Sequence, residues 1–297
     1  MNYLYYPGCS LKSTGKPYEE SLLVTFAALG VKLQELHDWN CCGATAYMAV
    51  NELKAFTLSA RNFCLAERQA GKAWEGPVNL VTPCSACYSL ALKAQHYLTD
   101  NPEMRKVVEK ALAEAGLSYE GRVQVRHPLD VLVNDIGLEK VKTQVTRPLT
   151  GMKVACYYGC AIVRPYATFD DQWNPTSMDR LVEALGGTPI DWALKTRCCG
   201  GTLTGTIREA GLRLGQLLLL EARRKGADIL ITTCPLCQFD LECFQDDIKD
   251  TYNEDVSIPV AYFTQLTGQA LGIPDKQLGI QRLFVSPEKA YKRSVGG

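Results

Sequence analysis

One pattern of cysteines occurs twice in this sequence, and thiol chemistry is the chemistry it offers. A single cysteine, an adjacent pair followed by glycine, and a Cys-x-x-Cys pair appear in this order in each half. Matching cysteines lie about 150 positions apart in a chain of 297 residues, which indicates an internal duplication. The first copy is Cys9, Cys41, Cys42, Cys84 and Cys87, and the second is Cys160, Cys198, Cys199, Cys234 and Cys237.

Five thiols in each half are more than one zinc ion uses. Zinc takes four ligands, and two adjacent cysteines point in divergent directions and seldom grip one ion together. A cluster of several irons accepts sulfur ligands on different metal atoms, so sulfur-only ligation favours an iron–sulfur cluster. Zinc and redox-active thiols remain as alternatives.

The composition is that of an ordinary globular protein. Lys plus Arg and Asp plus Glu both number 32, so no net charge favours nucleic acid or an anionic membrane surface. The longest apolar run, 217–220, is too short to span a membrane, and the first residues do not resemble a signal peptide. We therefore expect a cytoplasmic protein whose 13 cysteines stay reduced, which favours metal ligation over disulfides.

Strand and helix patterns alternate along both halves of the chain. Strands are predicted at 2–6, 31–36, 78–82, 123–125, 154–158 and 229–233, and helices at 18–29, 55–69, 88–97, 102–115, 131–136, 178–185 and 209–225. This alternation predicts an α/β fold of two tandem, pseudo-symmetric repeats with mostly parallel sheets. Pro148 and Gly151 interrupt the pattern, so we place the repeats at 1–147 and 148–297.

The predicted strands deliver the cysteines to one edge of each sheet. In both halves a strand runs into the Cys-x-x-Cys pair and a helix begins there, and the single cysteine also follows a strand. Free N–H groups at a helix start stabilise thiolates and anionic clusters. Each repeat is therefore expected to carry its cluster at the strand ends.

The cysteine pattern resembles the paired cysteine-rich CCG domains of the HdrB family, the B-type subunits of heterodisulfide reductase. The likeness includes Tyr6-Pro7-Gly8-Cys9, Val125-Arg126-His127 and 262–266, and covers almost the whole chain. The resemblance implies two non-cubane 4Fe-4S clusters, each held by five cysteines. These would be Cys9, Cys41, Cys42, Cys84 and Cys87 for one, and Cys160, Cys198, Cys199, Cys234 and Cys237 for the other.

The same resemblance implies the catalytic subunit of a complex that reduces a disulfide, such as the coenzyme B–coenzyme M heterodisulfide, to two thiols. That reduction takes two electrons, which two one-electron clusters together supply. The chain has no ferredoxin cysteine run and no dinucleotide fingerprint, so its electrons must come from partners. The resemblance suggests two of them, the ferredoxin-like C-type subunit and the flavin-containing A-type subunit of such complexes.

Other functions remain open for such a chain. It would also suit a CCG subunit of a sulfur-oxidation complex, or of a complex oxidising lactate, glycolate or glycerol phosphate. A non-catalytic electron relay or a zinc scaffold is a further alternative.

A few residues outside the pattern have expected roles. Cys64 and Cys243 are expected in the core, and Cys160 rather than Cys156 is the expected ligand because Gly159-Cys160 matches Gly8-Cys9. His127 is the candidate site-lining proton donor, although a structural role is the more common one. A final group comprises His37, expected to be structural, and Lys12, Lys16 and Arg164, candidates for contact with an anionic substrate.

Overall fold

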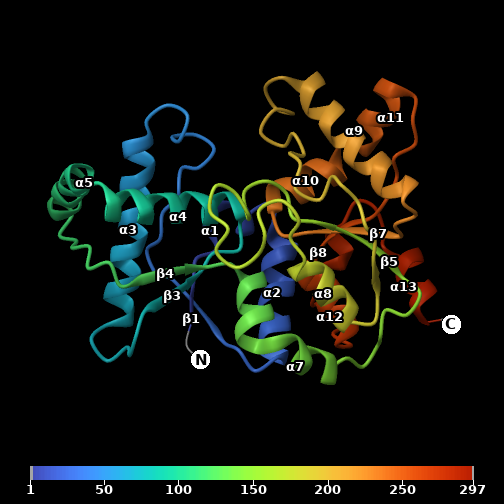
Figure 1. The fold of residues 1–297 in the computed structure, drawn as a ribbon, viewed down its shortest axis with the longest axis horizontal. Coiled ribbons are helices and arrows are strands. Elements are labelled where there is room, and N and C mark those ends of the chain that lie inside the picture. The colour runs from blue at the N-terminus through green and yellow to red at the C-terminus, as the bar shows by residue number, and fades with distance from the viewer. Residues whose placement is uncertain (1–2, 296–297) are drawn as a thin grey trace.

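The structure, a computed structural model, describes residues 3–295 and contains two four-stranded sheets (Figure 1). The first has the order β2-β1-β3-β4 and the second the order β6-β5-β7-β8, and every strand pair is parallel. The strands are β1 (Tyr3–Tyr5), β2 (Leu33–Glu35), β3 (Val78–Val81), β4 (Val123–Arg126), β5 (Lys153–Tyr157), β6 (Thr188–Pro189), β7 (Ile229–Thr232) and β8 (Val260–Tyr262). The predicted fold of two pseudo-symmetric α/β repeats is confirmed.

Helices connect the parallel strands, as crossover connections require. The first half contains α1 (Gly8–Leu11), α2 (Lys16–Ala28), α3 (Glu52–Ala70), α4 (Ser85–Asp100), α5 (Pro102–Glu114), α6 (Pro128–Asp130), the π-helix η1 (Val131–Gly137) and α7 (Leu138–Thr143). The second half contains α8 (Ser177–Ala184), α9 (Arg208–Arg224), α10 (Pro235–Cys243), α11 (Gln245–Tyr252), α12 (Phe263–Ala270), the 3-10 helix η2 (Ile280–Arg282) and α13 (Glu288–Val295).

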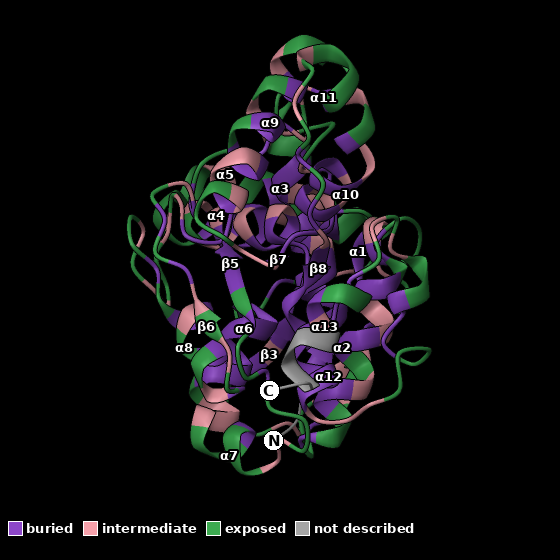
Figure 2. Cartoon of the chain, turned by 90° about the vertical axis from the view of Figure 1, so that its right-hand side faces the viewer, coloured by how far each residue is buried: buried purple, intermediate pink, exposed green. Residues whose placement is uncertain are grey.

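Strands β7 and β8 lie inside the molecule. Every residue of β7 and β8 is buried, which suits strands covered on both faces (Figure 2). The apolar sequence of β7, Ile229–Thr232, fits this position, whereas β6 is only two residues long and half exposed. The edge strand β6 therefore gave no clear strand pattern in the sequence.

The two repeats interlock through their helices. Helix α12 of the second half packs along α2 of the first half, and the two lie side by side in Figure 1. Ser21 Oγ lies 2.7 Å from Thr264 Oγ1, and the Tyr18 ring stacks on the Tyr262 ring at 4.4 Å. In the reverse direction, α7 of the first half packs on α8 of the second. Each repeat therefore completes its packing with a helix of the other.

The hydrophobic core is shared in the same way. One buried apolar cluster contains residues of both halves, such as Leu4, Phe56, Met178 and Phe263. A second cluster lies within the second half, around Leu219 and Leu241. The division at residues 147 and 148 stays a prediction, and the shared core indicates that neither repeat buries its apolar surface alone.

Candidate functional site

The strands deliver the cysteines to the sheet edges in the predicted way. Cys84 directly precedes α4 and Cys234 directly precedes α10, each with an extended backbone at the position before the first helical residue. Cys9 lies in the short helix α1 after β1. Because carboxyl ends of parallel strands share an edge, the distant cysteines of each half meet there.

The ten cysteines form one continuous string of thiols through the molecule. In the first half, Sγ of Cys9 and Cys41 are 3.7 Å apart, and Sγ of Cys42 and Cys87 are 3.0 Å apart. In the second half, Sγ of Cys199 and Cys237 are 3.4 Å apart. Hydrogen bonds between neighbouring thiols complete the string, whose order is Cys9, Cys41, Cys42, Cys87, Cys84, Cys234, Cys237, Cys199, Cys198 and Cys160.

The two halves of the string meet at its midpoint. The thiols of Cys84 and Cys234 are hydrogen-bonded to each other, which raises the pKa of Cys84. The pKa of Cys234 is lowered by hydrogen bonds from Cys237 and Cys84. Beside them, Ser85 Oγ lies 3.2 Å from Thr233 Oγ1 across the same junction. The two sets of five cysteines are therefore adjacent, and not separate sites on separate domains.

Exposure follows the same pattern in both sets. The single cysteine and the first cysteine of each adjacent pair are exposed, and the other three are buried. The pKa of Cys42 is lowered to about 3 by hydrogen bonds from Cys41 and Cys87, and that of Cys198 to about 2 by those from Cys160 and Cys199. Each set thus presents two thiols to solvent, and the pKa is strongly lowered for Cys42 in the first set and for Cys198 and Cys234 in the second.

Two glycines allow the single-cysteine segments to approach the Cys-x-x-Cys pairs. Gly8 has φ +66° and Gly159 has φ +72°, a conformation that favours glycine. A Cβ on Gly8 would lie 3.3 Å from Cys87 Sγ, and one on Gly159 would lie 3.4 Å from Cys237 Sγ. The backbone conformation therefore favours glycine before each single cysteine, and close packing adds to this at Gly8.

Two tyrosines that the sequence reasoning missed brace the sites. Tyr6 donates a hydrogen bond from its hydroxyl to the carbonyl of Asn40, at 2.9 Å, and Tyr157 donates to that of Arg197, at 2.7 Å. Both carbonyls belong to the residue immediately before an adjacent cysteine pair. The only signal for this role was the tyrosine that lies three positions before each single cysteine.

The second set of cysteines surrounds a pocket of about 120 Å³. Ser85 and Ala86 of the first half complete its wall. The pocket is lined by all five second-set thiols: Cys160, Cys198, Cys199, Cys234 and Cys237. Cys42 and Cys87 of the first set border a space of about 10 Å³.

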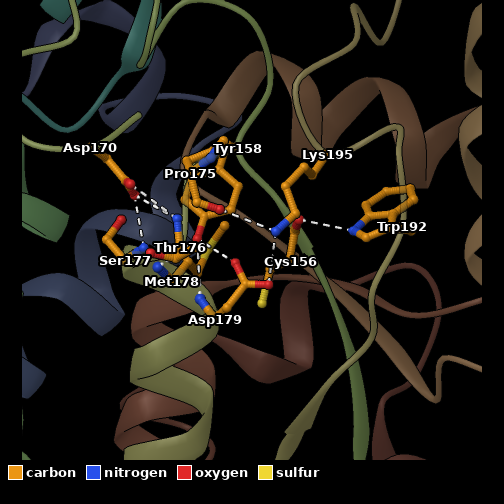
Figure 3. A network of polar contacts seen from close by, with 10 residues as sticks. All are labelled: Cys156, Tyr158, Asp170, Pro175, Thr176, Ser177, Met178, Asp179, Trp192 and Lys195. Atoms are coloured by element: carbon orange, nitrogen blue, oxygen red, sulfur yellow. Dashed lines mark hydrogen bonds and ion pairs between the residues drawn. The ribbon is translucent and has the colours of Figure 1, made fainter. Parts of the chain in front are cut away.

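A buried ion pair supports the second set from behind (Figure 3). Lys195 Nζ lies 3.0 Å from Asp179 Oδ1, and the Tyr158 hydroxyl donates to Asp179 Oδ2 at 2.5 Å. The carbonyl of Lys195 accepts hydrogen bonds from the backbone N–H groups of Tyr158 and Gly159. This network fixes the segment before Cys160 against the segment before Cys198.

His127 does not have the surroundings of a proton donor. Its ring is completely buried, Nε2 lies 3.1 Å from the carbonyl of Pro83, and Nδ1 accepts from the Leu129 N–H. Burial lowers the pKa of His127 to about 3, so the ring is neutral. It packs between rings at the junction of the two halves. These contacts favour a structural role, and the proton-donor assignment stays a prediction.

The remaining cysteines lie away from the string. Cys156 is fully buried within β5, and Cys64 is buried within α3. Cys243, expected in the core, is instead half-buried at the end of α10. None of the three takes part in the thiol contacts described above.

Two of the basic candidates for substrate contact have partners within the protein. Lys12 Nζ forms ion pairs with Glu19 at 2.6 Å and Glu35 at 2.8 Å. Arg164 donates to the carbonyl of Thr196, next to the second set. Both residues lie near cysteines in the sequence, but their contacts with protein groups indicate that they stabilise the loops.

The third basic candidate, Lys16, lies at the surface, and so does His37, which was expected to be structural. Lys16 is exposed at the first position of α2. The backbone N–H of His37 donates to Gln69 Oε1 at 2.8 Å. This contact joins the segment before the first adjacent cysteine pair to α3.

The donor atoms at the sheet edges suit an iron–sulfur group, because they are all sulfurs and there are five in each set. Within residues 3–295, no group of three or more His, Cys, Asp or Glu side chains is arranged to hold one metal ion. The donors that gather at the sheet edges are all sulfurs, and in the second half five of them face one pocket. Sulfur-only donor sets occur in iron–sulfur clusters and in four-cysteine zinc sites, and five sulfurs around one pocket exceed the four ligands that zinc takes.

The chain matches the model of the CCG cysteine-rich domain twice, over residues 3–90 and 154–242. It belongs to this family. Each match contains one complete five-cysteine set, so the resemblance inferred from the cysteine spacing is confirmed.

Curated relatives cover nearly the full length. The chain is 30% identical to the 8-methylmenaquinol:fumarate reductase membrane anchor subunit of Wolinella succinogenes, over 97% of this chain and 98% of that one. It is also 30% identical to the B-type subunit of the ferredoxin/F(420)H(2)-dependent CoB-CoM heterodisulfide reductase of Methanosarcina acetivorans, over 97% of each chain. A protein of Archaeoglobus profundus, described as like the B-type subunit of heterodisulfide reductase, is 30% identical over 94% of each chain.

The fold also occurs in a solved structure. A hypothetical protein from Helicobacter pylori superposes with a TM-score of 0.75 at 17% identity, over 96% of this chain and 52% of that one. The present chain thus spans about half the length of that protein, and the likeness shows the fold alone. No helix within the described part of the chain is long and apolar enough to cross a membrane.

Proposed function

We propose that this chain is the catalytic subunit of a heterodisulfide reductase-type complex and reduces a small-molecule disulfide to two thiols. The observation that carries the proposal is the adjacency of the two five-cysteine sets, joined through Cys84 and Cys234. Reduction of a disulfide takes two electrons, and two neighbouring one-electron centres meet that need.

The protein's own residues would hold two non-cubane 4Fe-4S clusters, which supply one electron each when bound. In each set, three thiols are buried away from water and two are exposed to solvent. Gly8 and Gly159 permit close approach, and Tyr6 and Tyr157 hold the backbone before each adjacent pair. The ligands would be Cys9, Cys41, Cys42, Cys84 and Cys87 in the first set, and Cys160, Cys198, Cys199, Cys234 and Cys237 in the second.

The proposal extends to partners and location. Relatives named as B-type subunits of heterodisulfide reductase support a multi-subunit complex. We propose the ferredoxin-like C-type subunit and the flavin-containing A-type subunit of such a complex as electron donors, in the cytoplasm. The coenzyme B–coenzyme M heterodisulfide is the first substrate to test, because the names of the Methanosarcina relatives contain it.

A second candidate is an electron-relay subunit of a respiratory reductase. It is favoured by the relative in Wolinella succinogenes, whose name specifies fumarate reduction and which matches over nearly the full length. In that case the clusters held by the same cysteines would pass electrons to a partner, and the chain would reduce no disulfide.

Metal analysis and a dye assay separate these functions. We expect anaerobically purified protein to contain about eight irons with matching sulfide, given two sets of five thiolates. A reduced viologen should be oxidised when a panel of disulfides, including the heterodisulfide, is added. Stoichiometric zinc with little iron would overturn the cluster assignment. Full iron content without disulfide-dependent oxidation would favour the relay function.

A further inference from the structure

A buried carboxylate near the second cysteine set has no counterpart in the first set. Asp240 lies three residues after Cys237 on α10 and is 4% exposed. The matching position in the first half, three residues after Cys87, is Leu90, which is equally buried. The second half therefore has a buried carboxylate at the helix position where the first half has an aliphatic side chain.

Asp240 faces the adjacent cysteine pair of its set. A Cβ built on Gly201, two residues after Cys199, would lie 3.3 Å from Asp240 Cβ. Thr204, on the loop after this pair, donates a hydrogen bond to Asp240 Oδ1 at 2.5 Å.

We propose that Asp240 makes the second cysteine set harder to reduce than the first, so that the first electron taken up by the chain resides at the first set. This inference rests on the proposed function, because it requires an iron–sulfur group at each set. In this proposal Asp240 acts through its charge on the reduction potential of the second set. The two repeats then have different roles, because the first set receives the first electron.

The physical reason is the energy of a charge pair in a poorly solvated site. Reduction adds one negative charge, and a fixed negative charge nearby opposes that addition. Burial raises the pKa of Asp240 to about 6, and the carboxyl is therefore ionised at pH 8. Water screens the repulsion weakly because the carboxylate and Cys199 are both buried.

The test is an anaerobic redox titration at pH 8, followed by electron paramagnetic resonance and absorbance. Parent protein should show two one-electron steps. Asp240→Asn should make the potential of the lower step more positive by about 59 mV, which is about a tenfold change in the equilibrium constant of a one-electron reduction. The potential of the other step should not change. The same substitution in a Cys9→Ser chain, where only the second set is complete, should show the shift in the remaining step.

Glu242→Gln is the matched control. Glu242 lies on the same helix and is buried, but its carboxylate accepts from the backbone N–H groups of Phe284 and Val285. Its substitution removes an equal charge and should shift either step by less than half as much. Asp240→Leu, which places the first-half side chain in the second half, is the second variant and should act like Asp240→Asn.

Three outcomes would overturn the inference. An unshifted potential in an iron-replete Asp240→Asn protein would remove the assigned role. Equal shifts in Asp240→Asn and Glu242→Gln would show a general effect of net charge. Loss of iron from both Asp240 variants would make the residue structural. Absence of iron from the parent protein would instead refute the proposed function, and the inference with it.

Discussion

The two halves of this protein share a cysteine frame and differ in what surrounds it. In both, a tyrosine braces the backbone before the adjacent pair and a glycine admits the single-cysteine segment. Around the second set, however, lie a pocket of about 120 Å³ and the buried ion pair between Lys195 and Asp179. Around the first, the comparable brace is the partly exposed cluster of Lys12 with two glutamates.

This difference shows which features tolerate change after a duplication. Both halves keep a glycine of positive φ before the single cysteine and an extended cysteine before the helix of the Cys-x-x-Cys pair, because each thiol must reach the edge of its own sheet. The side chains behind that edge are free to diverge, since they act on the site through charge and packing. The duplicated frame therefore supports two sites with unequal environments, and four experiments test how unequal they are.

The largest expected effect comes from a ligand in the second set. Cys160→Ser should remove about half of the iron and lower disulfide reduction at least ~100-fold, because misplaced reacting groups are costly. Cys156→Ser is the matched control, since that thiol is buried in β5 four residues earlier and should leave the iron content unchanged. Loss of iron from the Cys156 variant alone would mean that the repeats have been misaligned.

The braces should differ strongly in stability. Lys195→Met leaves the Asp179 carboxylate buried without its cation, and breaking such a pair costs about 3–5 kcal/mol in the free energy of unfolding. Lys12→Met breaks pairs that are partly exposed and should cost about 0–1 kcal/mol. Urea unfolding of both variants measures the difference. Similar losses in the two would contradict the contrast between buried and exposed braces.

His127, at the junction of the halves, should make stability depend on pH. The pKa of His127 is lowered to about 3 in the folded protein, against an ordinary value of about 6.5 in the unfolded chain. As the pH falls below about 6.5, the unfolded chain therefore binds a proton at His127 that the folded protein does not bind. Stability should be full above pH 7 and decline by about 2–4 kcal/mol toward pH 4. His127→Asn should flatten this part of the urea-midpoint profile. An unchanged profile would show that other groups control it.

A smaller effect than those of Lys195→Met and His127 should come from the tyrosine braces, and it should be equal in the two halves. Tyr6→Phe and Tyr157→Phe each remove one hydrogen bond to the carbonyl before an adjacent cysteine pair. Each should cost about 1–2 kcal/mol in unfolding free energy. Each should also alter the resonance signal of one cluster only. A change in both signals from a single variant would indicate that the two sites are not independently braced.

The sequence alone determined the fold class and indicated the two five-cysteine sets, whose role as ligands stays a prediction. Those predictions rest on local patterns: an apolar strand, a cysteine at its end and a helix start are encoded within a few residues. Parallel strands then bring such ends to one edge, so Cys9 and Cys84 were placed correctly without any knowledge of distant contacts.

Only the tertiary structure decided how the two sets relate. The contact of Cys84 with Cys234, the stacking of Tyr18 on Tyr262 and the burial of Asp240 all depend on how the two repeats pack. Periodicity reports whether a face is buried, and not which residue of a distant segment covers it. The same limit applies to His127: its place beside a strand end suggested a proton donor, and only the structure shows that residues of both halves enclose its ring.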